Sequence, residues 1–349
     1  MQVPRTAACA AAVGLLAILP ATAAAKPVAA LGHYAQRNLV SDQAGKAELM
    51  DPNLVNPWGL AFGPASGPTP AWTANNGNDN ATLYTGGLAP NDVKMVPLIV
   101  DIPGGAPTGQ VFNGSSGFMV DGAPARFIFS SEAGRITAWS QSSGTSAKTM
   151  ARVRGAVFKG LAIAGNRIYA TDFHNNRVDV WNANFKRVGR RHAFRDRRLP
   201  RRFAPFGIEA VGNHIWVTFA KQDAKGEDEI DKAHLGFVDV FDKRGRLLRR
   251  FARRGPLNAP WAVVKAPSGF GAASGDVLIG NFGDGRINVY KPNGRLLGQL
   301  ADASGAKLTI DGLWALEFGN GVIGTTKSLL FTAGPDDESH GLFGELNAM

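Results

Sequence analysis

Short apolar runs with alternating polar positions recur along the whole chain. The segments "RVDVW", "FVDVF" and "RINVY" alternate with period two and are rich in β-branched and aromatic residues, which is typical of half-buried strands and not of helices. Turn-forming residues are abundant, with 43 glycines and 20 prolines among 349 residues, while 44% hydrophobic residues supply a core. The pattern therefore predicts an all-β protein with many turns.

The strand pattern forms a unit that occurs six times. Each copy has an apolar stretch around a small residue, a second strand that ends in a small or polar residue, a tight loop, and an alternating third strand. The small residues of the six copies are Gly59, Gly117, Gly160, Gly207, Ala262 and Ala315, spaced 43 to 58 residues apart. This period suits four-stranded blades. The sequence predicts a six-bladed β-propeller that forms one domain over residues 26–349.

The two ends of the repeat region predict how the ring closes. The last copy stops after its third strand, "GLFGEL", whereas the segment "HYAQRNLVSD" precedes the first copy. We expect an N-terminal strand near Tyr34 to Val40 to supply the missing fourth strand, because this pairing leaves no open sheet edge at the junction.

Residues 1–25 have the features of a secretory signal peptide. Arg5 supplies positive charge, "AACAAAVGLLAILPA" is a short apolar core, and "ATAAAKP" offers small residues for cleavage. No later stretch has the roughly 20 apolar residues that span a bilayer, and the only cysteine, Cys9, lies in this segment. We expect an exported protein without disulfides that begins near Lys26 and is secreted or held in the periplasm or cell envelope.

Several motifs carry a resemblance to a known family. The segment "TDFHNNRVDVWN" resembles an NHL-type repeat, and "DPNLVNPWGLAFGP", "AKQDAKGEDE" and "FTAGPDDESHGLFG" resemble a family of uncharacterised exported bacterial β-propeller proteins. The resemblance covers nearly all of residues 26–349 and implies the fold and export, but no reaction. Some members carry a C-terminal PEP-CTERM sorting tail, a pattern that the ending "GELNAM" lacks.

The loops between second and third strands predict a binding face. In a propeller these loops emerge on the same side as the connections between blades, and here they are polar, as in "NNGNDN", "DFHNNR" and "AGPDDESH". Eight residues on this face are predicted to bind a ligand: Trp58, Lys221, Gln222, Asp223, Trp261, Trp314, Asp336 and Asp337. His174 and His340 lie in the same loops and are the candidate catalytic acids or bases, although loop histidines more often have no such role.

Aligned second strands place four oxygen donors at equivalent positions near the central channel: Asn75, Glu132, Asp172 and Asn281. Hard oxygen ligands are those that Ca²⁺ prefers, and six-bladed propellers of the gluconolactonase and paraoxonase kind hold calcium in such a ring. The sequence thus predicts a calcium site. The same residue types also form turns by bonding to the local backbone, and both interpretations stay open.

Positive charge is concentrated in two stretches of a chain whose formal net charge is +10. Residues 186–202 hold nine Lys or Arg against one Asp, and residues 243–254 hold seven without an acid. Such a flank would attract polyanions, with a strong salt dependence, although basic runs are often only solvated surface. The predicted polyanion-binding residues are Arg190, Arg191, Arg197, Arg198, Arg201, Arg202, Arg249, Arg250, Arg253 and Arg254.

No familiar catalytic signature is present, since G-x-S-x-G, H-E-x-x-H and Walker patterns are absent from the sequence. Three functions remain open: non-enzymatic binding of a ligand on the loop face, calcium-dependent hydrolysis of a lactone or ester, and a scaffold that binds acidic polymers. The expected partner is a small molecule or an extracytoplasmic polymer, because export argues against nucleic acid.

Overall fold

The computed structural model describes residues 27–190 and 192–349. The predicted signal peptide, residues 1–25, lies outside the described residues. Apart from strands, the described part holds three single-turn 3-10 helices: η1 (Asn76–Asn78), η2 (Gln141–Ser143) and η3 (Gly271–Ala273). No helix within these two ranges is long and apolar enough to cross a membrane. The predicted all-β class is confirmed.

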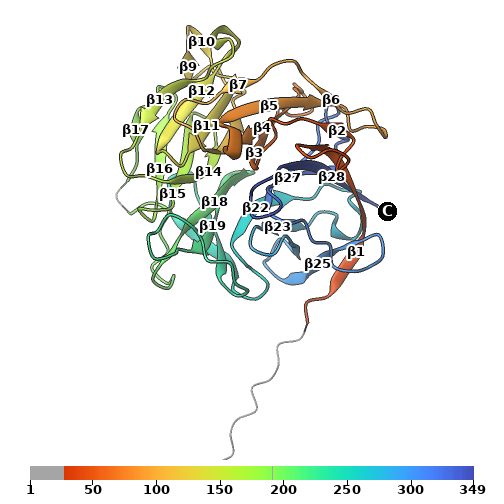
Figure 1. Cartoon of the computed structure of the whole chain (residues 1–349). Helices are drawn as coiled ribbons and strands as arrows, with labels where there is room; N and C mark the ends of the chain where they lie inside the picture. Colours follow the sequence, from red (N-terminus) through yellow and green to blue (C-terminus); the bar gives the residue numbers. More distant parts are fainter. Residues whose placement is uncertain (1–26, 191) are drawn as a thin grey trace, which may run out of the picture.

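Among the described residues, six inner strands surround a central axis (Figure 1). They are β3 (Pro57–Ala61), β8 (Pro107–Phe112), β14 (Phe158–Ile163), β18 (Phe203–Val211), β22 (Pro260–Lys265) and β26 (Leu313–Phe318). Each inner strand contacts the next, and β26 contacts β3, so the ring is closed. The predicted propeller fold is confirmed.

The other strands extend each antiparallel unit outward from its inner strand. The second strands are β4 (Ala71–Asn75), β11 (Phe127–Ser131), β15 (Arg167–Asp172), β19 (His214–Lys221), β23 (Val277–Asn281) and β27 (Leu329–Ala333). The third strands are β5 (Asn80–Thr85), β12 (Arg135–Trp139), β16 (Arg177–Asn182), β20 (Gly236–Phe241), β24 (Ile287–Tyr290) and β28 (Leu342–Ala348). The outer strands are β6 (Lys94–Met95), β7 (Val100–Asp101), β13 (Lys148–Arg152), β17 (Arg187–Val188), β21 (Leu247–Arg253), β25 (Leu296–Asp302) and β1 (Ala30–Ser41). Outside this pattern, β2 (Leu49–Met50) pairs with β1, and β9 (Met119–Val120) pairs with β10 (Ala123–Pro124).

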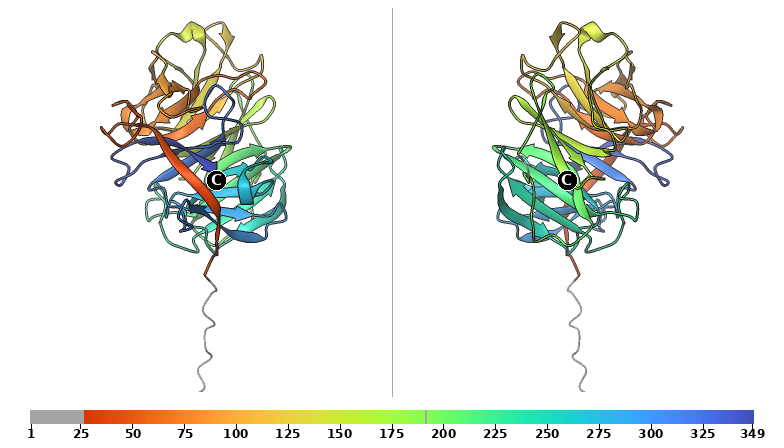
Figure 2. Two further views of the ribbon diagram at one scale, coloured as in Figure 1. Left: turned by 90° about the vertical axis from the view of Figure 1, so that its right-hand side faces the viewer. Right: turned by 90° about the vertical axis from the view of Figure 1, so that its left-hand side faces the viewer.

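The N-terminal strand β1 completes the last unit, as the sequence predicts. It pairs antiparallel with β28 from Tyr34 opposite Ala348 to Ser41 opposite Leu342, and Figure 2 shows it running along the flank of the ring beside the C-terminal strands. Its first residues also pair in parallel with β25 of the preceding unit. This second pairing was not expected, and it joins the last two units into one nine-stranded sheet.

Small residues on the inner strands let neighbouring strands approach closely. A Cβ atom added to Gly109 would collide with the backbone of Leu161, and one added to Gly207 would collide with the Trp261 carbonyl. Gly109 on β8, and not Gly117, is the small residue of the second unit. The segment "SGFMV" resembles an inner strand, but Phe118 within it has a left-handed φ of 57°, so the chain turns there.

Aromatic side chains pack together at the centre of the ring. Trp58 stacks on Trp314 with ring centroids 3.8 Å apart, and Trp261 meets Trp58 edge-on at 5.5 Å. Phe282 stacks on the other side of Trp314 at 4.0 Å. All three tryptophans are buried. The sequence predicts them as ligand contacts on the rim, whereas in the structure their rings pack against one another in the buried core.

Candidate functional site

Seven carboxylate side chains line one cavity where the loop face meets the axis. The cavity, of about 430 Å³, is called the acidic cavity below. Its acids are Glu132, Asp228, Glu229, Asp231, Asp311, Asp337 and Glu338, and the side chains of Lys159, Trp58, Asn76 and Phe282 also line it. Except for Lys159 and Trp58, which lie on inner strands, these residues follow second strands or precede β26. The acidic cavity is therefore formed mainly by loops that lie on the same face of the propeller.

Lys159 is the single basic residue among the lining residues of the acidic cavity. Its side chain is 1% exposed, and its Nζ lies 2.6 Å from Glu132 Oε1 and 3.4 Å from Asp228 Oδ1. The same atom lies 4.8 Å from the centre of the Trp58 ring, within cation–π range. Burial lowers the pKa of Lys159, but Glu132, Glu229 and Asp228 more than offset this, so the pKa lies above its usual value. The ammonium group is therefore charged and neutralises one carboxylate.

Burial raises the pKa values of three acids of the acidic cavity: Glu229, Asp231 and Glu338. Burial raises the pKa of Glu229 to about 8, with a smaller contribution from Asp231 and an opposing one from Lys159. Burial also raises the pKa of Glu338, although Asn56 donates a 2.6 Å hydrogen bond to its carboxylate. Carboxylates that stay partly protonated near neutral pH are poised to ionise when a cation arrives.

The local fold of the β19–β20 loop brings three of these acids to the axis. The carboxylate of Asp223 accepts hydrogen bonds from the backbone N–H groups of Gly226, at 2.6 Å, and Glu227, at 3.0 Å. Ile230 then bonds back to the Lys221 carbonyl. The tight turn returns residues 228–231 toward the acidic cavity, so Asp223 positions the loop.

In three of the four predicted calcium ligands, the side chain forms hydrogen bonds or an ion pair with residues close in sequence. Asn75 donates to Asn80 at 2.8 Å, Asp172 accepts from Asn175 and pairs with Arg177 at 2.8 Å, and the Asn281 side chain donates to Asp284 at 2.9 Å. These contacts agree with the alternative interpretation of the sequence, in which these residues stabilise local turns. Only Glu132 of the four lines the acidic cavity.

The strand register explains why Glu132 differs from the other three. Pro107 on β8 is opposite Ser131, as Pro57 on β3 is opposite Asn75. Glu132 is thus one residue beyond the equivalent position, and successive side chains alternate between faces. Across residues 27–190 and 192–349, no group of three or more His, Cys, Asp or Glu is placed to hold a metal ion. The calcium site stays a prediction.

The other predicted site residues are divided among several places. Trp58 and Asp337 line the acidic cavity, and Trp261 lines a second cavity of about 420 Å³ between the inner strands. Trp314 is fully buried, and its indole N–H donates to Asn56 at 3.0 Å. Gln222 is buried and donates to the Phe173 carbonyl at 2.7 Å.

The two candidate catalytic histidines do not line the acidic cavity. His174 is exposed, and His340 Nδ1 lies 2.8 Å from an oxygen of Asp42 near the N-terminal strand. Lys221 lies over the Phe203 ring at 5.4 Å, and the backbone N–H of Asp336 donates to Asp311. None of these contacts brings an acid–base pair to the carboxylate cluster.

Six residues that line the acidic cavity are not among the site residues predicted from sequence: Lys159, Asp228, Glu229, Asp231, Asp311 and Glu338. A signal was present for Lys159, since it is the single charge in the strand "VFKGLAI". A charge at such a position is buried by the neighbouring strands and needs a partner. The loop acids could not be chosen from sequence, because only the fold of each loop decides which carboxylates reach the axis.

The predicted basic residues form two groups. Arg190, Arg197, Arg201 and Arg202 line a cleft between β16 and the segment before β18. Arg198, Arg250 and Arg253 line a neighbouring depression beside β21, and Arg249 lies over the rings of Trp216 and Phe251. Arg254 has a left-handed φ of 50° beyond β21, and Arg191 lies outside the described residues.

No family model matches the chain. It is 31% identical over 329 residues to the uncharacterised protein R648 of Acanthamoeba polyphaga mimivirus, covering 88% of this chain and 78% of R648. A second uncharacterised mimivirus protein, L690, is 29% identical, with 92% and 87% covered. These relatives are viral, so the expected bacterial exported family is not shown.

Among solved structures, a streptogramin B lyase superposes with a TM-score of 0.54 at 12% identity, over 91% of this chain and 98% of the lyase. A virginiamycin B lyase from Staphylococcus aureus gives 0.53 at 12% identity, over 91% and 100%. At this identity the likeness shows the propeller fold alone.

Proposed function

This chain belongs to the family of the uncharacterised mimivirus protein R648, and on that premise we propose a function from the site itself: the protein binds a small organic cation in the acidic cavity. The ligand carries two or more amino groups and a short apolar part. This is non-enzymatic recognition on the loop face of the propeller.

The observation that carries the proposal is the charge of the acidic cavity. Seven carboxylates and one lysine line it, in a chain whose formal net charge is +10. The composition of the protein therefore cannot explain this local excess of acid. A concave site that concentrates one sign of charge attracts a ligand of the opposite sign.

The contacts of Lys159 indicate which cations suit the cavity. Its ammonium group is held by Glu132 and Asp228 and lies over the Trp58 ring. A ligand amine would use the same chemistry with Glu229, Asp337 and Glu338, and Phe282 offers an apolar surface. Calcium is less suited, because it needs six to eight oxygens at 2.3–2.6 Å, while Lys159 already occupies Glu132.

Titration calorimetry with spermidine tests this proposal on the purified protein. We expect saturable binding that D228N/E229Q weakens by about tenfold or more, because it removes two charge-assisted contacts. The matched control E227Q/D121N changes the charge equally but alters exposed residues outside the cavity, and it should bind normally. Equal losses in both variants, or calcium binding with no spermidine binding, would contradict the proposal.

The affinity for spermidine should rise with pH. The pKa of Glu229 is raised to about 8, so this carboxyl is mostly protonated at pH 6 and mostly ionised at pH 8.5. A cation binds the ionised form, and affinity should therefore increase several-fold between these values. Calorimetry at both values measures the change, and E229Q should reduce it. An affinity that is the same at pH 6 and pH 8.5 would show that Glu229 does not face the ligand.

Export remains part of the proposal, supported by the signal-like residues 1–25 and by the resemblance to exported bacterial propellers. When the full chain is produced in a bacterial host, we expect it outside the cytoplasm with an N-terminus near Lys26. Fractionation and N-terminal sequencing measure this. Cytoplasmic protein that starts at Met1 would contradict export.

A further inference from the structure

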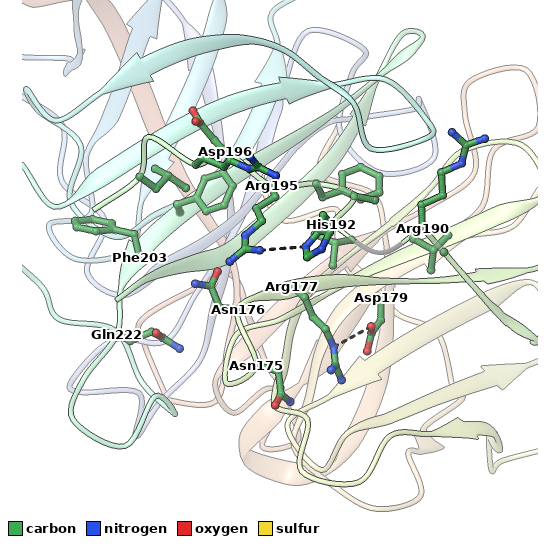
Figure 3. A pocket seen from close by; sticks show the side chains of 18 of the residues that line it. Asn175, Asn176, Arg177, Asp179, Arg190, His192, Arg195, Asp196, Phe203 and Gln222 are labelled. Carbon is green, nitrogen blue, oxygen red and sulfur yellow. Dashed lines mark hydrogen bonds and ion pairs between the residues drawn. The ribbon is translucent and has the colours of Figure 1, made fainter. Parts of the chain in front are cut away.

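The third unit has an incomplete outer strand. In that unit β17 pairs with β16 at only two positions, Val180 opposite Val188 and Trp181 opposite Arg187. Among the described residues, the first half of β16 therefore has no outer-strand partner. The chain instead continues to the next unit, and residues 192–202, called the strap below, lie across from β16. A cleft of about 1130 Å³ remains between β16 and the strap, and Figure 3 shows it from close by.

The strap is held in place by contacts with the third and fourth units. Phe194 is buried, with its ring 5.5 Å from Tyr169 and 5.4 Å from Phe241, and its backbone N–H donates to the Gly245 carbonyl at 2.8 Å. Asp196 on the strap forms an ion pair with Arg250 of β21. These contacts fix the position of the strap, which forms one wall of the cleft. A preformed wall reduces the entropy cost of binding a ligand there.

The cleft is strongly basic. Two aspartates line it together with seven arginines: Arg177, Arg187, Arg190, Arg195, Arg197, Arg201 and Arg202. Both aspartates are buried, and each already contacts two guanidinium groups: Asp179 those of Arg177 and Arg187, and Asp196 those of Arg198 and Arg250. The two acids therefore do not neutralise the other arginines.

Five arginines of the cleft form no ion pair with any described residue: Arg190, Arg195, Arg197, Arg201 and Arg202. Figure 3 shows Arg177 with Asp179 on the β16 side, and Arg195 hydrogen-bonded to His192 on the strap side. Like charges gathered around one concave surface repel each other, and an anion between them removes that cost. A convex solvated surface would spread such charges apart.

We propose that this arginine cleft is a second binding site, for a ligand that carries several closely spaced phosphate or sulfate groups. A guanidinium group presents a planar fork of N–H donors that matches such oxyanions in a bidentate manner. Arginines on both walls can contact adjacent groups of one extended ligand. The site is separate from the acidic cavity, since the two share no lining residue.

Calorimetry with sodium tripolyphosphate, followed by a sulfated oligosaccharide, tests the site on the whole protein. We expect saturable binding at 50 mM NaCl that weakens strongly at 300 mM, because salt screens exposed charges. R197Q/R201Q should weaken binding by about tenfold or more, since two charge-assisted contacts are lost. Both residues are exposed and outside any ion pair, so the variant should fold normally.

The matched control K148Q/R152Q removes the same charge from β13, where both residues are exposed, and it should bind tripolyphosphate within about twofold of the parent chain. Binding by D228N/E229Q should also be unchanged, which separates this site from the acidic cavity. The proposal is overturned if K148Q/R152Q loses as much affinity as R197Q/R201Q, or if no saturable binding occurs at 50 mM NaCl. Tighter binding of poly-L-glutamate than of both oxyanion probes would also overturn it, because the cleft would then recognise an acidic peptide.

Discussion

A chain that lacks residues 27–42 is expected to aggregate and to lose its cooperative unfolding transition. The deletion removes β1 and exposes the edge of β28, which then offers unpaired N–H and C=O groups to other chains. It also removes three buried hydrophobic side chains, Tyr34, Leu39 and Val40, each of which contributes about 2 kcal/mol. Their sum is comparable to the net stability of a typical domain. Light scattering and thermal denaturation followed by circular dichroism measure the effect.

A circular permutant provides the control for this deletion. The backbone N–H of Met349 donates to the His33 carbonyl, so the C-terminus of β28 lies beside the start of β1. A chain that runs from residue 43 to 349, then through a short turn into residues 31–42, keeps every pairing with β28 as a hairpin. It should unfold cooperatively at nearly the parent melting temperature. If residues 43–349 alone stayed monomeric and melted as sharply as the parent, the closing role of β1 would be disproved.

Lys159→Met is expected to destabilise the fold by about 3 kcal/mol, because it removes the partner of a buried ion pair and leaves acids uncompensated. The ammonium group is almost fully buried and contacts both Glu132 and Asp228. Its loss increases the repulsion among the carboxylates of the acidic cavity. Thermal and urea denaturation at pH 8 measure the change, since the acids are most ionised there.

Two comparisons show whether charge or packing causes this loss. The double variant K159M/E132L removes a carboxylate as well, and it should recover part of the lost stability. Spermidine should raise the melting temperature of K159M more than that of the parent, because the added cation replaces the missing ammonium group. A K159M protein as stable as the parent, or equal stabilisation by spermidine in both, would be inconsistent with an acidic cavity organised around a cation.

Most of the fold was predictable from sequence, because strand alternation and turn residues are local. The pattern of "RVDVW" and its copies correctly indicated the third strands, and the missing last strand correctly pointed to residues near Tyr34. The exception is the second unit, where the sequence pattern predicts Gly117 as the small residue of the inner strand and the structure has Gly109 there. The two segments look alike in composition, and only packing against Leu161 distinguishes the glycine that must approach a neighbouring strand.

The candidate site was predictable only in its place on the loop face. The residue types in the loops after second strands predicted a polar face, but Asn75, Asp172 and Asn281 turned out to bond within their own units. Glu132 reaches the acidic cavity because it is one residue past the register of those three. A shift of one residue reverses the face of a side chain, and sequence alignment at this level cannot detect it.

The sequence by itself determined the all-β class, the repeat and the pairing of the chain ends, since period-two patterning and turn chemistry act over a few neighbouring residues. Only the tertiary structure decided which charges meet. Lys159 and Glu132 are 27 residues apart in the chain, and Asp228 is 69 residues from Lys159, yet all three converge at the axis. The strength of an electrostatic contact depends on distance and burial, and both are set by the closed ring and not by the order of residues.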